Sequence, residues 1–130
     1  MKLTLNVLFS VSAISLALAG LVNLFAPEAL NPGVVSAGAS PLLLIYLREP
    51  GVFQIVIAIL NWMARNAEAS KARDAIVLAN TLLFGLAGIK VGLVVLNGGP
   101  IYFLIAVVIN LLFAAAFFWV GRTSMSTKTS

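Results

Sequence analysis

The chain has no histidine, no cysteine and only four carboxylates among its 130 residues. These absences exclude histidine-ligated haem, thiolate metal sites, cysteine nucleophiles and imidazole acid–base catalysis. They also exclude disulfides, so cysteine usage says nothing about the redox compartment. We therefore predict that the protein is not an enzyme and has no catalytic residue, no metal site and no cofactor. The four acids are Glu28, Glu49, Glu68 and Asp74.

Charged residues are also scarce, at 9%, whereas hydrophobic residues make up 62% of the chain. Soluble domains are about 25% charged and about 45–50% apolar. A water-soluble fold of this size would leave much of the apolar surface exposed, so lipid must be the solvent. The length suits a single transmembrane domain, residues 1–130.

Long apolar runs fill most of the sequence. A run of roughly 20 apolar residues forms a helix long enough to cross a hydrocarbon core of about 30 Å. Short turns between such helices make neighbours antiparallel. The sequence therefore predicts an all-α integral membrane protein, a four-helix up-down-up-down bundle. The expected spans are approximately residues 3–25, 50–65, 73–96 and 101–121.

The second span is the least regular. Proline is favoured at the first position of a helix, so we expect this span to begin at Pro50. It would be only about 24 Å long, and either the bilayer thins or the helix extends backward through a proline kink. We expect residues 34–47 to be an interfacial or re-entrant segment, or the first part of such a kinked span.

The first run has an alternative interpretation as a signal peptide. Lys2 would form its charged start, and Ala17-Leu18-Ala19 would be the cleavage site. The apolar run continues beyond that site to Phe25, which favours a membrane span.

The ends of the third span carry helix signals. Ser70 is expected to cap its first turn, where Asp74 favours the helix dipole. In Asn97-Gly98-Gly99-Pro100, glycine is expected to end the third helix and Pro100 to begin the fourth.

Basic residues indicate the orientation. If the four spans alternate in direction, six of the eight lysines and arginines lie on the side that holds both termini. Arg48 lies on the other side, and Lys90 lies within a span. Because lysine and arginine favour the cytoplasmic side, we expect an inner-membrane protein with both termini cytoplasmic. The six are Lys2, Arg65, Lys71, Arg73, Arg122 and Lys128.

Lys90 is a charge inside an apolar span, at a depth of roughly 10 Å from its outer end. Its long side chain could carry the ammonium group to the headgroups. It could instead pair with Glu49, beside Arg48 and Glu28, in a polar cluster at the outer side. Such a cluster would hold helices together, bind an anionic group or line a pathway for ions.

Small residues mark two helix faces that predict close packing, within the chain or between subunits. One face lies on the third span and the other on the first. They comprise Gly85, Gly88 and Gly92, and Ala13, Ala17 and Gly20.

Polar residues within spans are expected to form interhelical hydrogen bonds, with Asn61 and Asn80 close enough to touch. The others are Gln54, Thr81 and Asn110. Aromatic residues near the span ends are expected to anchor the helices at the interfaces. They are Tyr46, Trp62, Tyr102 and Trp119.

Several segments carry a resemblance to a known group. They are Phe25-Ala26-Pro27-Glu28, Arg48 to Gly51, Ile59-Leu60-Asn61-Trp62-Met63-Ala64-Arg65 and Ser70-Lys71-Ala72-Arg73-Asp74-Ala75-Ile76-Val77. Together they resemble small four-helix bacterial membrane proteins that are broadly DoxX-like. The resemblance implies a bacterial inner-membrane bundle and carries over no catalytic residue.

Three functions remain open from the sequence. The favoured one is an accessory or structural subunit that contacts the lipid bilayer and packs against other membrane subunits or copies of itself, without binding nucleic acid. The alternative is a small oligomeric transporter or channel that uses Lys90 and Glu49, with Gln54 as a further polar group. An enzyme acting on lipid or quinone, with Glu49 or Asp74 as its acid, comes third.

Overall fold

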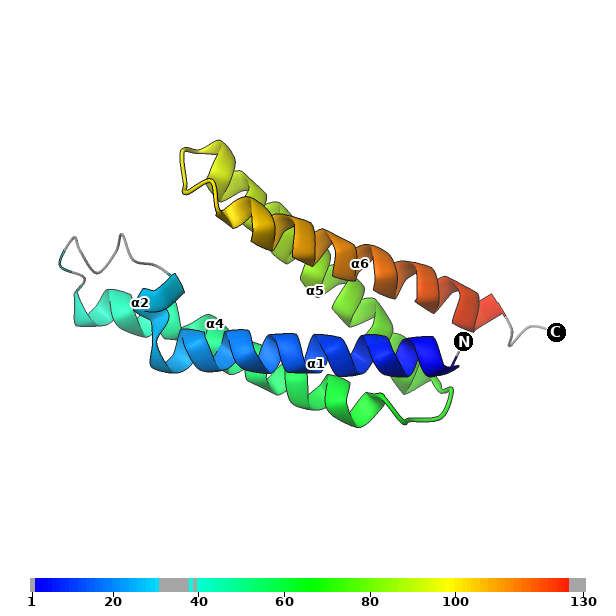
Figure 1. Cartoon of the computed structure of the whole chain (residues 1–130). Coiled ribbons are helices and arrows are strands. Elements are labelled where there is room, and N and C mark those ends of the chain that lie inside the picture. The colour runs from blue at the N-terminus through cyan, green and yellow to red at the C-terminus, as the bar shows by residue number, and fades with distance from the viewer. Residues whose placement is uncertain (1, 31–37, 39, 127–130) are drawn as a thin grey trace. The chain divides into compact units, whose positions relative to one another are not determined.

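In the computed structural model, which describes residues 2–30, 38 and 40–126, all regular structure of the described residues is helical. Four of the helices are long and apolar enough to cross a membrane by length and composition. This confirms the predicted all-α class and indicates a multi-pass membrane protein. The elements are α1 (Lys2–Phe25), α2 (Pro27–Leu30), α4 (Pro41–Ala64), α5 (Lys71–Leu96) and α6 (Phe103–Ser126) (Figure 1).

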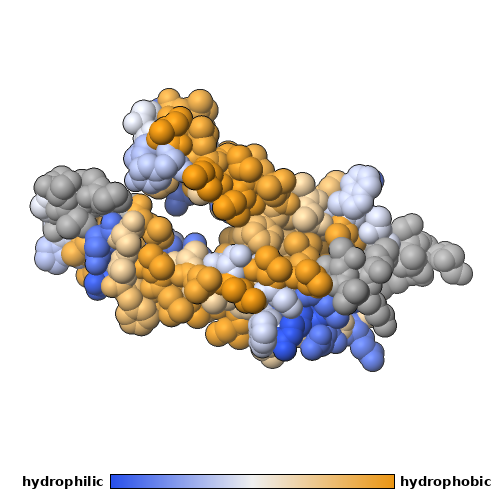
Figure 2. Space-filling model, in the orientation of Figure 1, coloured by the Kyte–Doolittle hydropathy of each residue, from blue (hydrophilic) through white to orange (hydrophobic). Residues whose placement is uncertain are grey.

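Apolar side chains cover the outside of the long helices (Figure 2). Leu18 of α1, Leu86 of α5 and Leu112 of α6 are 61%, 64% and 65% exposed. Water would make such surfaces unfavourable, whereas hydrocarbon solvates them at no cost. The exposed faces therefore indicate contact with a lipid bilayer.

The chain divides into two compact units, one containing residues 9–65 and the other residues 1–8 and 66–130. In the first unit, α1 and α4 pack antiparallel. The backbones approach closely at Gly20 and Gly51, where a Cβ built on Gly51 would lie 2.7 Å from the Gly20 carbonyl oxygen. Glycine on both helices permits this approach, because neither residue has a side chain at the contact. The two backbones then gain dispersion contacts with each other.

In the second unit, α5 and α6 form an antiparallel hairpin. The ring of Phe84 stacks on those of Phe113 and Phe117, with centroids 4.7 and 6.0 Å apart. Gly88 lies against Leu111, because a Cβ there would be 3.0 Å from the Leu111 Cδ2 atom. A Cβ on Gly121 would lie 2.7 Å from the Val77 Cγ1 atom. Aromatic stacking and close approaches at Gly88 and Gly121 thus hold this hairpin together.

The start of the second long helix differs from the prediction. Helix α4 begins at Pro41, not Pro50, and Pro50 lies inside it. Ser40 caps the helix by accepting a hydrogen bond from the Leu43 backbone N–H at 3.2 Å. Pro41 favours a helix start as much as Pro50 does. Pro50 can lie within the helix because a membrane helix tolerates proline in its interior.

The extended α4 has 24 residues, about 36 Å, which removes the shortfall of the predicted 50–65 span. Residues 41–47 are the first turns of this helix, which confirms the alternative that they form the first part of the second span, and not an interfacial or re-entrant segment. Residues 34–37 and 39 of that predicted segment, and Lys128, lie outside the described residues.

The caps of the third long helix were predicted correctly. Ser70 precedes α5 and its hydroxyl accepts a hydrogen bond from the Arg73 backbone N–H at 3.2 Å. After α5, Gly98 adopts a φ of 87°, a conformation that favours glycine. Pro100 does not begin the last helix. Its carbonyl accepts from the Phe103 N–H, and α6 starts at Phe103 after this turn.

Candidate functional site

The predicted polar cluster is divided between the two units. Arg48 and Glu49 are exposed in the first half of α4, and Lys90 is exposed on α5. Lys90 lies six residues before the end of its helix, about 9 Å along the axis. That distance and the exposure suit a lysine whose ammonium group reaches the headgroups. The pairing of Lys90 with Glu49 stays a prediction.

The predicted small-residue faces have distinct environments. Gly20 packs against α4, since a Cβ there would lie 2.8 Å from Ile55 Cγ1, and Gly88 packs against α6. A Cβ on Gly85 would only touch Ala114, at 3.9 Å. On Gly92 it would meet nothing within 4 Å, so Gly92 does not contribute to the α5–α6 contact. Its packing against another chain stays a prediction.

Two polar residues of α4 make the interhelical hydrogen bonds that the sequence predicted for them. Asn61 Nδ2 donates to the Ser12 hydroxyl at 3.0 Å, and Gln54 Oε1 accepts from Asn23 Nδ2 at 2.8 Å. Ser12 and Asn61 are both fully buried. The sequence interpretation missed Ser12 and Asn23, although each is a polar residue within an apolar run.

Polar residues of the α5–α6 hairpin bond to their own helices. Asn80 Nδ2, Thr81 Oγ1 and Asn110 Nδ2 donate to carbonyls four residues earlier, at 2.8, 3.0 and 2.7 Å. Such bonds satisfy a polar group in lipid without involving another helix. The predicted contact between Asn61 and Asn80 joins the two units and stays a prediction.

Arg73, which the sequence interpretation assigned to orientation, is buried and only 4% exposed. Among the residues that the structure describes, none provides a hydrogen-bond partner for its Nε atom. Burial of an N–H group without an acceptor is unfavourable. The hydropathy of the sequence does not predict this burial. Arg73 lies in the first turn of α5, before the apolar part of the helix begins.

Two other arginines lie over aromatic rings. The Arg65 guanidinium carbon is 3.4 Å from the centre of the Trp62 ring, and Arg65 Nη1 donates to the Trp62 carbonyl at 2.9 Å. Arg122 lies over Phe118 at 5.3 Å. Each ring holds a cation near the end of a long apolar helix, where a bilayer interface is expected.

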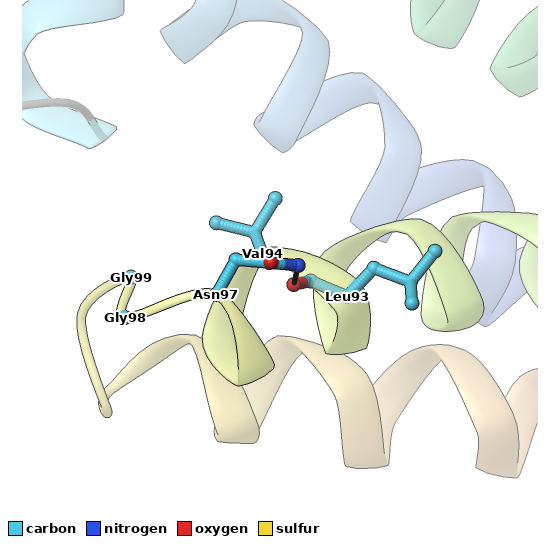
Figure 3. Close-up of a pocket in the computed structure, with 5 residues that line it drawn as sticks. All are labelled: Leu93, Val94, Asn97, Gly98 and Gly99. Atoms are coloured by element: carbon cyan, nitrogen blue, oxygen red, sulfur yellow. Dashed lines mark hydrogen bonds between the residues drawn. The ribbon is translucent and has the colours of Figure 1, made fainter.

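A hollow of about 480 Å³ lies at the turn after α5 (Figure 3). Among the described residues that line it, Asn97 has the only polar side chain, and its Nδ2 donates to the Leu93 carbonyl at 2.7 Å. The lining residues are Leu93, Val94, Asn97, Gly98 and Gly99.

A second hollow, the α1–α4 groove, has a volume of about 240 Å³ and apolar walls. Small residues form its floor, and three isoleucines and a tryptophan form its sides. The lining residues are Ala13, Ile14, Ala17, Ile55, Ala58, Ile59 and Trp62.

Comparison with known proteins identifies no relative. No protein-family model, no curated protein and no solved structure matches the chain. Within residues 2–30, 38 and 40–126, no three acidic residues group together as a metal site would require. The candidate sites therefore rest on the geometry alone.

Proposed function

We propose that this chain is a small non-catalytic membrane protein, an accessory or structural subunit of a bacterial inner membrane. One observation carries the proposal: the polar side chains within the spans form structural hydrogen bonds. Ser12, Asn23, Gln54 and Asn61 join α1 to α4, and the α5–α6 polar residues bond to their own backbone. The α1–α4 bonds use polar groups for helix packing, and the others satisfy polar groups within one helix.

The surface offered to a partner is the open part of α5. Gly92 has no neighbour within 4 Å of a built Cβ, and Ile89 and Leu96 are 58% and 83% exposed. A glycine between exposed aliphatic side chains leaves a notch into which a partner helix can approach closely. We propose that a helix of a larger membrane complex packs there.

Purification in a mild detergent tests this role. We expect larger membrane subunits to co-purify with the tagged chain, and Gly92→Leu to reduce their yield by filling the notch. Ala79→Leu is the matched control, because Ala79 is an exposed residue of the same helix at roughly the opposite azimuth. A clean homo-oligomer with ion flux in liposomes that requires Lys90 would support a transporter instead and would contradict the subunit role.

The orientation is a further part of the proposal. The basic residues support an up-down-up-down arrangement with both termini in the cytoplasm, as do the two antiparallel helix pairs. Because the chain has no cysteine, single cysteines can be introduced at Ser70 and Gly98. An impermeant thiol reagent applied to intact cells should label position 98 and not position 70. The opposite pattern would reverse the orientation.

A further inference from the structure

The α1–α4 groove is open along one side of this helix pair. Its floor is buried, with Ala13 and Ala58 3% and 5% exposed, whereas its sides are half-exposed, with Ile14 at 53% and Ile59 at 55%. From Ile55 to Trp62 the groove extends seven residues along α4, about 10 Å. An apolar groove of this form, on a helix pair exposed to the bilayer, admits a hydrocarbon chain.

A fixed positive charge lies one turn beyond the groove. Trp62 forms one wall, and its ring carries the Arg65 guanidinium at 3.4 Å. One N–H of Arg65 donates to the Trp62 carbonyl, and among the described residues no other acceptor is shown for this guanidinium. The stacked arginine therefore has N–H groups to offer to an anion. Planar guanidinium groups recognise phosphate through two parallel hydrogen bonds.

We propose that the α1–α4 groove binds one anionic phospholipid, with an acyl chain between the helices and the phosphate on Arg65. Two complementary features, an apolar channel and a cation at its end, match the two parts of such a lipid. A second copy of the chain fits less well. A second apolar helix could cover the groove walls, but it offers no anion to the Arg65 guanidinium.

Quenching of Trp62 by lipids with brominated acyl chains tests the site directly. The background variant is Trp119→Phe, which leaves Trp62 as the one tryptophan and changes a residue that is 71% exposed. The protein is reconstituted in phosphatidylcholine containing small amounts of brominated phosphatidylglycerol or brominated phosphatidylcholine. An interfacial arginine should favour the anionic lipid about fivefold, so half-quenching should need about one fifth as much phosphatidylglycerol.

Matched variants separate the charge from the groove. Arg65→Gln should abolish the preference for phosphatidylglycerol, whereas Arg122→Gln, which removes the other ring-stacked arginine, should retain it. Ala17→Leu should fill the groove and reduce quenching by both lipids, while Ala115→Leu on an exposed position of α6 should not.

Circular dichroism checks that each variant is folded. Equal quenching by the two lipids in the parent protein, or an unchanged preference in Arg65→Gln, would overturn the proposal. Rapid disulfide formation between chains carrying Ala17→Cys would also overturn it, because a second copy would then occupy the groove.

Discussion

Replacing Gly51 by alanine tests whether close backbone contact holds α1 and α4 together. The new methyl carbon would lie 2.7 Å from the Gly20 carbonyl oxygen and 2.9 Å from the Leu24 backbone nitrogen. Backbone atoms of a packed helix cannot rotate away as a side chain can. The two helices must therefore separate by about 0.7 Å to restore an ordinary contact of 3.4 Å.

Such a separation has a calculable effect on stability. A gap of 0.5–1 Å forfeits about a quarter to a half of the dispersion energy of the affected contacts. It also stretches the 2.8 Å hydrogen bond between Asn23 and Gln54, because the new methyl lies 3.2 Å from Asn23 Cβ. Overpacking of this kind costs about 1–3 kcal/mol. The better helix propensity of alanine offsets about 0.5–1 kcal/mol of that loss.

The measurement compares Gly51→Ala with Gly92→Ala. Both replace a helical glycine, but a methyl at Gly92 meets no atom within 4 Å. We expect Gly51→Ala to lower the free energy of unfolding by about 1–2 kcal/mol and Gly92→Ala to raise it by about 0.5–1 kcal/mol. Titration of purified protein in micelles with sodium dodecyl sulfate, followed by circular dichroism, gives both values. Equal shifts in the same direction would refute the close contact between α1 and α4.

Four further substitutions test other features by the same titration. Asn23→Leu and Gln54→Leu should each lower the free energy of unfolding. In a double-mutant cycle the two should show a coupling energy of about 0.6 kcal/mol. A coupling energy of zero would contradict the hydrogen bond between them. Arg73→Met should leave the free energy of unfolding unchanged or raise it by about 1–4 kcal/mol. The substitution removes a buried cation whose Nε has no partner among the described residues. A lower free energy of unfolding would show that the charge is compensated. Pro50→Ala should restore a backbone N–H donor within α4 and raise the free energy of unfolding by as much as about 3 kcal/mol. A decrease would indicate that the proline shapes the helix for packing.

The helices could be predicted well where bilayer thickness alone sets their length. Helix α1 ends at Phe25 and α5 at Leu96, as the apolar runs indicated. The prediction was wrong at the start of α4, because proline both begins helices and is tolerated inside them in lipid. Two prolines nine residues apart, Pro41 and Pro50, gave the same local signal. The length that a bilayer requires, which the 24 residues of α4 supply, was the better guide.

The packing contacts were less predictable than the helices. Spacing identified Gly20 and Gly88, but it also selected Gly92, where a built Cβ meets no other element of the described residues within 4 Å. It missed Gly51, which directly follows Pro50, the residue at which the sequence predicted the second span to begin. A sequence shows which small residues share a face of one helix, whereas the rotation of the partner helix decides which of them are contacted.

The two helix pairs use different interactions, for a physical reason. Lipid solvates an apolar helix as well as another helix does, so apolar burial gives no net attraction between them. Glycine contact and two side-chain hydrogen bonds supply that attraction between α1 and α4. In the α5–α6 hairpin, stacking of Phe84 and close side-chain approaches at Gly88 and Gly121 supply it, and a short turn already limits how far the helices can separate. Helices α1 and α4 lack such a short turn, which explains why polar groups are needed between them.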